Sequence, residues 1–381
     1  MADVSEKEQC FMKNKILTLI FILYIFFFAV GSLIARDRDF SDMENRELAD
    51  MPKLSGKTLA SGDFFEDFET YLSDQIICKD FLMKLKVSSN LVLGQTKVED
   101  VFFGDGDMLI KEYVNPYNQL GKNIGYINEF VDANPEFEFT WLIVPNACVI
   151  YEERLPNYAQ CYNQNEVMAY IIGTASDNMN VADCTRELMD AKEEYIYYNT
   201  DHHWTMNGAY IGYGVLCEAL SVDALSKDMY NIRVASDEFL GTLYSSAPTF
   251  SQGADCIILY ENPMGEYKVE YLDTGDVSDS LYNYDNLNIK DKYTTYLDGN
   301  HAIMKISSNS SNKEKLLVIK DSYAHCLLPL LADNFSEIYV VDLRYYHQSV
   351  SELARAEGIE RIVFINNLDF LSTDNNFLWL E

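Results

Sequence analysis

Residues 316–325 read LLVIKDSYAH, an apolar run that ends at a polar turn and is followed by a helical pattern. Leu316 to Lys320 is predicted to be a buried strand, and Ala324 to Leu331 the helix after it. The alternation continues with a strand, a helix and a strand at 338–342, 350–357 and 361–365. Strands that alternate with helices predict an α/β domain with a mostly parallel sheet and helices on both faces.

The sequence before this stretch shows the same alternation. Helices are predicted at 117–133, 185–192 and 206–220, and strands at 137–144 and 195–198. A hairpin of residues 101–103 and 108–110 is predicted to open the domain. Residues 225–310 are rich in Tyr, Asp, Asn and Ser and interrupt the alternation, so they are predicted to form an insertion with short strands.

The N-terminal region contains one long apolar segment. Ile16–Ala35 carries no charge, and at about 1.5 Å per residue it is long enough to cross a hydrocarbon layer of about 30 Å. We expect a retained signal anchor, with a cleaved signal peptide as the alternative. Basic residues flank the segment on both sides, so the long acidic body after it decides the orientation and favours a single-pass, type II arrangement in the cell membrane.

These patterns divide the chain into four parts. Residues 1–15 are predicted as a cytoplasmic tail, 16–35 as the transmembrane anchor, 36–97 as a helical connector and 98–381 as the extracytoplasmic α/β domain. The connector is predicted from aromatic and aliphatic residues that recur at helical spacing after residue 64.

The composition limits the possible partners. The formal net charge is -31 at pH 7, from 29 Lys and Arg against 60 Asp and Glu. A field of this sign repels nucleic acid, which is therefore not expected as a partner.

The cysteines give no complete disulfide framework. Cys10 precedes the apolar segment, and an odd number of cysteines follows it. Cys161 and Cys184 flank a polar segment and are candidates for a disulfide. Buried thiols are predicted at Cys148, Cys217, Cys256 and Cys326. No C-x-x-C occurs, so a structural zinc site has no support in the sequence.

Ser322 lies on the turn between a predicted strand and a predicted helix. A hydroxyl there stands at the edge of the sheet, and the N–H groups that open the helix would face an oxyanion formed beside it. Ser322 is therefore a candidate nucleophile, and a nucleophile of this kind needs a base.

The candidate base lies in Tyr195–Tyr210, YIYYNTDHHWTMNGAY. In an extended segment, residues two apart share a side, so Asp201 and His203 are expected on one side and His202 on the other. Asp201 would then orient His203, which would take the proton of Ser322.

Other polar residues follow the predicted strands and are expected at the same edge of the sheet. Lys320 and Asp321 are predicted as turn and partner residues. Asp342 and Arg344 are predicted to form an ion pair that braces the site. The tyrosines at 197–198 and 345–346 are predicted to pack rather than to bind sugar. Substrate-binding or supporting roles are predicted for Trp204, His202, Tyr323, Arg344 and Asn146.

Three alternatives remain open for these residues. Asp201 and His203 can be a structural pair that caps the helix after them. His325, one helical turn after Ser322, is an alternative base. A metal site is the third alternative, although adjacent histidines point apart on a strand and make poor joint ligands; it would use Asp201, His202, His203 and His325.

The sequence resembles the family of DHHW proteins and, more distantly, the alginate O-acetylation proteins that have an SGNH-hydrolase-like domain. By this resemblance Asp201, His203 and Ser322 would form a catalytic triad. The serine stands in Lys-Asp-Ser instead of the Gly-Asp-Ser of ordinary SGNH hydrolases, so the resemblance supports the triad better than it supports a substrate. The segments that carry it are Met43–Arg46, Asp201–Thr205, Phe239–Thr242, Lys320–Tyr323 and Val341–Tyr346.

The resemblance implies acyl-ester chemistry, with O-acetyl transfer onto a cell-surface or secreted polysaccharide as the expected reaction. It implies no metal or nucleotide cofactor, and a membrane-bound acyltransferase as the acetyl donor. The alternatives are a carbohydrate esterase or deacetylase with the same triad, and a non-catalytic surface scaffold. A Ser322 oxygen more than about 5 Å from both ring nitrogens of His203 would favour the scaffold.

Overall fold

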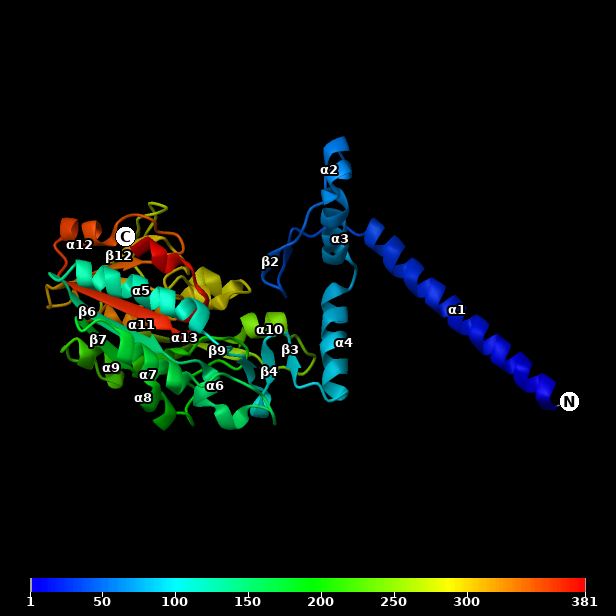
Figure 1. Cartoon of the computed structure of the whole chain (residues 1–381), viewed down its shortest axis with the longest axis horizontal. Coiled ribbons are helices and arrows are strands. Elements are labelled where there is room, and N and C mark those ends of the chain that lie inside the picture. The colour runs from blue at the N-terminus through cyan, green and yellow to red at the C-terminus, as the bar shows by residue number, and fades with distance from the viewer. Residues whose placement is uncertain (1, 381) are drawn as a thin grey trace. The chain divides into compact units, whose positions relative to one another are not determined.

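The computed structural model describes the backbone of residues 2–380 and the side chains of residues 12–380. The chain divides into two compact units, Met1–Asn90 and Leu91–Glu381. Figure 1 shows the chain, with many of the elements of both units labelled. The side chain of Cys10 lies outside the described ones.

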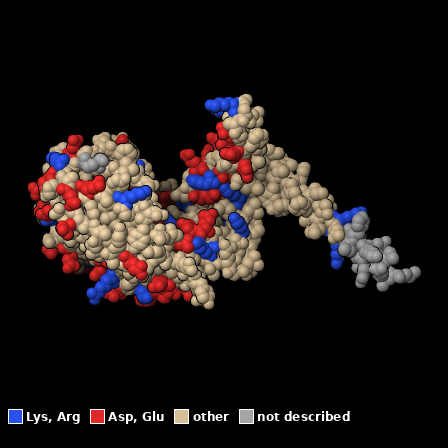
Figure 2. Space-filling view, viewed as in Figure 1, with Lys and Arg blue, Asp and Glu red and all other residues tan. Residues whose placement is uncertain are grey.

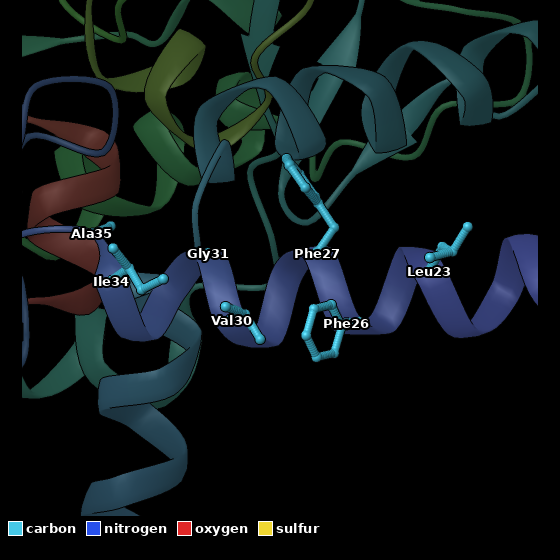
Figure 3. Close-up of a pocket in the computed structure, with 7 residues that line it drawn as sticks. All are labelled: Leu23, Phe26, Phe27, Val30, Gly31, Ile34 and Ala35. Atoms are coloured by element: carbon cyan, nitrogen blue, oxygen red, sulfur yellow. The ribbon is translucent and has the colours of Figure 1, made fainter.

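The first unit begins with helix α1, Ala2–Ile34. By length and composition its part from Met12 to Ile34 is suited to cross a membrane, and its most apolar window is not buried by the rest of the chain. Figure 3 shows Phe26 and Phe27 projecting from different sides of this helix. A helix that exposes apolar side chains all around needs an apolar environment.

The remainder of the first unit is a short hairpin and three helices. Buried Asp74 at the end of α3 pairs with Arg46 at 2.5 Å and Lys79 at 2.9 Å, which ties the hairpin to α3 and α4. α3 and α4 lie within residues 36–97, where helices were predicted. The elements are β1 (Phe40–Ser41), β2 (Arg46–Glu47), α2 (Gly56–Ser61), α3 (Asp63–Gln75) and α4 (Lys79–Val92).

The second unit is built on an eight-stranded sheet with the strand order β11-β10-β12-β14-β13-β15-β6-β7. The run from β14 to β7 is parallel, and β12, β10 and β11 add an antiparallel edge. The parallel strands are β6 (Glu138–Val144), β7 (Met179–Asp183), β13 (Lys315–Lys320), β14 (Glu337–Val341) and β15 (Arg361–Asn367). The antiparallel strands are β10 (Tyr267–Tyr271), β11 (Val277–Ser278) and β12 (Ile303–Ser308).

Helices cover both faces of this sheet, as Figure 1 shows. α7 and α12 connect parallel strands in one direction across the sheet, and α11 connects them in the other direction. Because such crossovers are right-handed, α7 and α12 lie on one face and α11 lies on the other. On the α7 face lies α5, whose Tyr117 ring is 5.2 Å from that of Tyr170 in α7, and α9 packs on α11. These helices are α5 (Tyr117–Ala133), α7 (Gln164–Thr174), α9 (Met206–Ala219), α11 (Ala324–Leu331) and α12 (Val350–Glu357).

Shorter elements complete the second unit. A three-stranded sheet is formed by β3 (Lys97–Val98), β4 (Val101–Phe103) and β5 (Leu109–Lys111), and a separate hairpin by β8 (Asn231–Phe239) and β9 (Asp255–Glu261). The short helices are α6 (Ala147–Ile150), α8 (Thr185–Asp190), α10 (Thr242–Ser246) and α13 (Leu368–Thr373). The 3-10 turns are η1 (Asp105–Asp107), η2 (Glu152–Arg154), η3 (Lys227–Met229), η4 (Tyr284–Asn288), η5 (Lys292–Thr295) and η6 (Asn376–Leu380).

The predicted α/β class is confirmed, and the helices predicted at 117–133, 324–331 and 350–357 match α5, α11 and α12 at both ends. The strand predicted at 195–198 is wrong. Tyr197 makes only an isolated bridge with Trp204, because the segment turns back on itself before it can pair with the sheet. The strand beside β6 is β7, whose exposed edge positions gave it a weaker apolar pattern.

The insertion predicted at 225–310 is only partly correct. β8 and β9 stand apart from the main sheet, but β10, β11 and β12 extend it on the antiparallel side. Their alternation of buried and exposed residues is typical of strands with one solvated face. The polar composition that suggested an insertion therefore marks the edge of the sheet.

The surface carries the acidic excess of the composition. Figure 2 shows Asp and Glu side chains spread over the visible face of the α/β unit, with Lys and Arg scattered among them. Many of the basic side chains are paired, as Arg233 is with Glu261 at 2.8 Å.

The cysteines from Cys78 onward are free thiols. The candidate disulfide between Cys161 and Cys184 is therefore absent from these described residues: Cys184 is buried with its thiol 3.5 Å from the carbonyl of Ile143. The predicted burial of Cys148, Cys217 and Cys326 is confirmed, and that of Cys256 is wrong because its side chain is half-buried on the β8–β9 hairpin.

Candidate active site

Ser322 lies in the turn between β13 and α11. β13, β14, β15 and β6 are parallel, so their carboxyl ends meet at one edge of the sheet. Leu316–Ile319 is buried between the helical layers, whereas Ser322 is half-buried. The buried strand thus holds a partly accessible hydroxyl at the rim of the sheet.

Three of the predicted residues come together at this rim. His203 Nε2 lies 2.7 Å from Ser322 Oγ, and His203 Nδ1 lies 2.5 Å from Asp201 Oδ1. The backbone N–H of His203 also donates to Asp201 Oδ1 at 3.0 Å. Asp201 and His203 therefore meet through a tight turn of the Asx type, and not through the alternation of an extended strand.

Asp201 is held from its other side by α10. The backbone N–H and the hydroxyl of Thr242 donate to Asp201 Oδ2 at 2.8 and 3.0 Å. Burial acts to raise the pKa of Asp201, but the two neighbouring imidazoles and these hydrogen bonds outweigh it and lower the pKa. The carboxyl group is thus kept ionised beside His203.

Gly241 makes this arrangement possible. A Cβ at Gly241 would lie 2.3 Å from Oδ2 of Asp201, so only glycine fits there. Sequence reasoning assigned no role to Gly241 or Thr242, although both lie in the Phe239–Thr242 segment that carries the family resemblance. No local pattern places that segment beside Asp201.

Tyr293 is a further residue that sequence reasoning missed, because it lies in the supposed insertion. Its ring stacks on that of His203, with centroids 3.9 Å apart and planes at 11°. Its hydroxyl donates to the carbonyl oxygen of Ser322 at 3.0 Å. Tyr293 therefore fixes both the imidazole plane and the turn that carries the serine.

Trp204 and Tyr323 join the two halves of the site. The indole N–H of buried Trp204 donates to the carbonyl of Tyr323 at 2.8 Å, and the Tyr323 hydroxyl donates to the carbonyl of His202. These reciprocal bonds link the histidine turn to the serine turn. Neither side chain bonds to Ser322, and a substrate-binding or supporting role for both stays a prediction.

A buried charge cluster lies behind the serine turn. Lys320 Nζ is 2.7 Å from Asp342 Oδ2 and 2.7 Å from His325 Nε2. The predicted pair of Asp342 and Arg344 is confirmed at 2.6 Å. Burial lowers the pKa of Lys320 and lowers that of His325 strongly. His325 is thus engaged with Lys320, which argues against it as the base for Ser322.

Asn146 and Asp321 bond to neighbouring loops and not to the Ser322 hydroxyl. Asn146 Nδ2 donates to Asn367 Oδ1 at 3.0 Å, and the backbone N–H of Asn367 donates to Asp321 Oδ2 at 2.6 Å. Burial raises the pKa of Asp321 to about 6. Asp321 is a turn residue, as predicted, and Asn146 braces the neighbouring loop.

The expected oxyanion donors are only partly available. The N–H of Tyr323 donates to Asp321 Oδ1 at 2.8 Å, and that of Ala324 donates to Asp321 O at 3.3 Å. The expectation that the N–H groups opening α11 face an oxyanion is therefore wrong for these two. Among the described residues no hydrogen bond uses the backbone N–H of Ser322, which leaves it as a donor beside its own hydroxyl.

A metal site was considered unfavourable because adjacent histidines on a strand point apart, and the structure differs from that expectation. Ligand atoms of Asp201, His202 and His203 lie within 4.8 Å of one another, so the two histidines do not point apart. However, both Nδ1 atoms and both carboxylate oxygens already take part in hydrogen bonds. A metal would have to break these bonds, and His325 is held elsewhere.

The four tyrosines differ in exposure. Tyr197, Tyr198 and Tyr346 are buried, as predicted for packing residues. Tyr345 departs from that prediction, because its side chain is 52% exposed and lies under the guanidinium of Arg344, 5.5 Å from its ring centre.

Comparison with known proteins identifies the family. The sequence matches the family model described as DHHW protein over residues 137–341, more than half of the chain. The chain belongs to the DHHW family. No curated protein matches the sequence.

Solved structures share the fold. A DHHW family protein from Eubacterium siraeum DSM 15702 is 24% identical, with a TM-score of 0.64 over 74% of this chain and 93% of that one. Bacillus cereus PatB1, in a structure with a sulfonyl adduct, is 20% identical, with a TM-score of 0.62 over 74% of this chain and 100% of that one. The O-acetyltransferase domain of Pseudomonas putida AlgJ is 15% identical, with a TM-score of 0.46 over 72% and 93%.

Proposed function

We propose that this protein transfers acetyl groups onto a cell-surface or secreted polysaccharide through a triad of Ser322, His203 and Asp201. The observation that carries the proposal is the continuous contact from Ser322 Oγ to His203 Nε2 and from His203 Nδ1 to Asp201, at 2.7 and 2.5 Å. These distances favour an enzyme over a scaffold, because a base must lie within hydrogen-bond reach of the proton it removes.

In this reaction the Ser322 oxygen attacks the acyl carbonyl while His203 Nε2 takes the hydroxyl proton. His203 passes that proton to the leaving group, and the acyl group remains on Ser322 as an ester. A sugar hydroxyl then attacks this ester, gives its proton to His203 Nε2, and Ser322 leaves with the same proton. Asp201 stabilises the imidazolium in both halves, and the backbone N–H of Ser322 is the proposed donor to the developing oxyanion.

Exposed aromatic rings near Arg344 support a sugar acceptor. The guanidinium of Arg344 lies 5.5 Å from the ring centres of both Tyr345 and Phe370. Phe370 packs on Phe377 in the turn η6, and the same turn contains Trp379. The Tyr345 and Trp379 side chains are 52% and 41% exposed. Exposed rings with polar neighbours suit the apolar faces and hydroxyls of sugars.

The proposed location follows from helix α1. A retained signal anchor at residues 16–35, after a cytoplasmic tail at 1–15, would hold the catalytic unit outside the cell membrane. An acetyl donor must then be supplied at the membrane, and the family resemblance favours a membrane-bound acyltransferase partner.

A covalent probe tests the triad. Because the similar PatB1 is known with a sulfonyl adduct, the full chain in detergent would be treated with an aryl sulfonyl fluoride and with an aryl acetate. We expect mass mapping to place the adduct on Ser322. Ser322→Ala and His203→Ala should each lower acylation on the order of 10³-fold or more, and the double variant should be no worse, since the members of one catalytic unit do not add.

Ser310→Ala, in the loop after β12, is the matched control and should label like the wild type. Labelling that survives Ser322→Ala would refute the nucleophile. Acetyl release to water that no glycan acceptor can redirect would make the protein an esterase or deacetylase with the same triad.

A further inference from the structure

The triad gives no role to His202, the first histidine of the Asp-His-His-Trp motif. His202 was expected to point away from the site, yet its ring centre lies 3.9 Å from that of His203 and its side chain is 29% exposed. Its Nδ1 lies 2.7 Å from Thr242 Oγ1. Among the hydrogen bonds of the described residues, the ring of His202 takes part only through Nδ1, so Nε2 is left over.

The shared carboxylate brings the Nδ1 atoms of both histidines together. His203 Nδ1 lies 2.5 Å and His202 Nδ1 3.6 Å from the same Asp201 oxygen. The Nε2 atom of an imidazole lies across the ring from Nδ1, so both Nε2 atoms face away from Asp201. The two rings lie 3.9 Å apart and are tilted by only 37°, so His202 lies directly beside the imidazole whose Nε2 reaches Ser322 Oγ.

The hydrogen bonds also fix the tautomer. The Thr242 hydroxyl donates its only proton to Asp201 Oδ2 at 3.0 Å, because an ionised carboxylate can only accept. Its oxygen must therefore accept from His202 Nδ1, which carries the ring proton. A lone pair remains on His202 Nε2.

This lone pair persists during the reaction. Partial burial and the adjacent His203 ring lower the pKa of His202, so the ring is neutral near pH 7. When His203 becomes an imidazolium, its charge disfavours a second proton on His202 even more. His202 Nε2 is thus a permanent hydrogen-bond acceptor next to a base that gains and loses a proton.

We propose that His202 Nε2 accepts a hydrogen bond from the hydroxyl adjacent to the attacking one, so that the site recognises a vicinal diol of a sugar acceptor. The inference rests on the proposed acyl transfer. The attacking hydroxyl has one proton, which must go to His203 Nε2, so a second hydroxyl is needed to satisfy His202. Neighbouring hydroxyls of a sugar ring are about one hydrogen-bond length apart, roughly 2.8 Å, and match two side-by-side acceptors.

Acceptor competition tests this role. The full chain in detergent is acetylated with an aryl acetate, and the acyl-enzyme is offered ethanol, 1,2-propanediol or a methyl glycoside. The readout is the ratio of transfer to the diol over transfer to the monohydric alcohol, measured within each variant. We expect the wild type to favour the diol and the glycoside by about tenfold, the value of one hydrogen bond.

Two substitutions separate the ring nitrogens. His202→Asn keeps a donor near the Nδ1 position and has no atom at Nε2, so it should abolish the roughly tenfold preference. His202→Gln places an amide oxygen near the Nε2 position and should restore part of it. His301→Asn, which alters another imidazole bonded to a carboxylate, Asp273 at 3.0 Å, is the control and should keep the wild-type ratio.

Each result decides the matter. A wild type without a diol preference, or a His202→Asn variant that keeps it, would overturn the role of His202 while leaving acyl transfer intact. A wild type that forms no acyl-enzyme at Ser322 would instead overturn the proposed function. Equal losses of acylation and transfer in both His202 variants, with an unchanged ratio, would reduce His202 to a support for His203.

Discussion

Gly241→Ala tests whether Asp201 has to stay in place for acylation. A Cβ on Gly241 would lie 2.3 Å from both Cβ and Oδ2 of Asp201 and 2.7 Å from its Cγ. Non-bonded carbon atoms rest about 3.5–4.0 Å apart, so the aspartate must move by about 1 Å. Backbone angles of -83° and -161° suit alanine as well as glycine, and the effect is therefore purely a matter of contact.

The displacement acts on both activity and stability. Asp201 holds His203 at 2.5 Å, and a misplacement of about 1 Å in such a constellation costs about 10²-fold in rate. Overpacking of this kind also costs about 1–3 kcal/mol of unfolding free energy. We expect acylation of Ser322 to fall about 100-fold in a variant that still folds.

The assay is the burst of aryl alcohol released from an aryl acetate, together with thermal unfolding. Gly214→Ala is the matched control, since a Cβ at this position in α9 meets nothing within 4 Å. It should keep the burst and gain about 0.5–1 kcal/mol of stability, the usual gain from replacing glycine inside a helix. A wild-type burst in Gly241→Ala would refute the argument that acylation needs Asp201 in its present position.

Three further changes have defined outcomes. Lys320→Met should lower the unfolding free energy by about 3 kcal/mol, because buried Asp342 loses one of its two cationic partners and keeps only Arg344; a denaturant melt that shows less than about 1 kcal/mol would contradict this. The folded-state pKa of Asp201 is lowered, so the stabilisation from its carboxylate is present above about pH 4 and is lost as the pH falls further. Asp201→Asn should therefore lose less unfolding free energy than the wild type between about pH 5 and 3. Parallel curves of unfolding free energy against pH for the two proteins would exclude this. Trp204→Phe removes the indole donor to the buried carbonyl of Tyr323 and should lower the unfolding free energy by about 2 kcal/mol in the same melt. An unchanged unfolding free energy would contradict this.

Much of the fold was predictable because the deciding patterns are local. The apolar runs of β6, β13 and β15 and the helical periods of α5, α11 and α12 contain their own signal. Sheet edges were not predictable in this way, since β10 and β12 join the sheet by pairing with residues distant in sequence. The segment at 195–198 failed for the same reason: its residues are as apolar as a strand, but no partner strand lies beside it.

Some residues of the candidate site could be predicted from the sequence, and others could not. Asp201, His203 and Ser322 could be selected because each residue type and its position at a strand or helix end has a chemical meaning. Gly241, Thr242 and Tyr293 could not, because their importance arises only from contacts made in the folded chain. Tyr293 stacks on the imidazole from a stretch that sequence composition marked as peripheral.

The order Asp-His-His-Trp has a physical reason in each position. A strand would send adjacent histidines to opposite sides, but the turn closed by the His203 N–H and Asp201 brings both rings to one carboxylate. His203 bonds to that carboxylate directly, whereas His202 is linked to it through the Thr242 hydroxyl, which donates to the second oxygen and accepts from His202. Trp204 forms an antiparallel bridge with Tyr197, and its indole N–H donates to the carbonyl of Tyr323 in the serine turn. The turn therefore places two imidazoles side by side in unlike surroundings, one bonded to Asp201 and Ser322 and the other to Thr242.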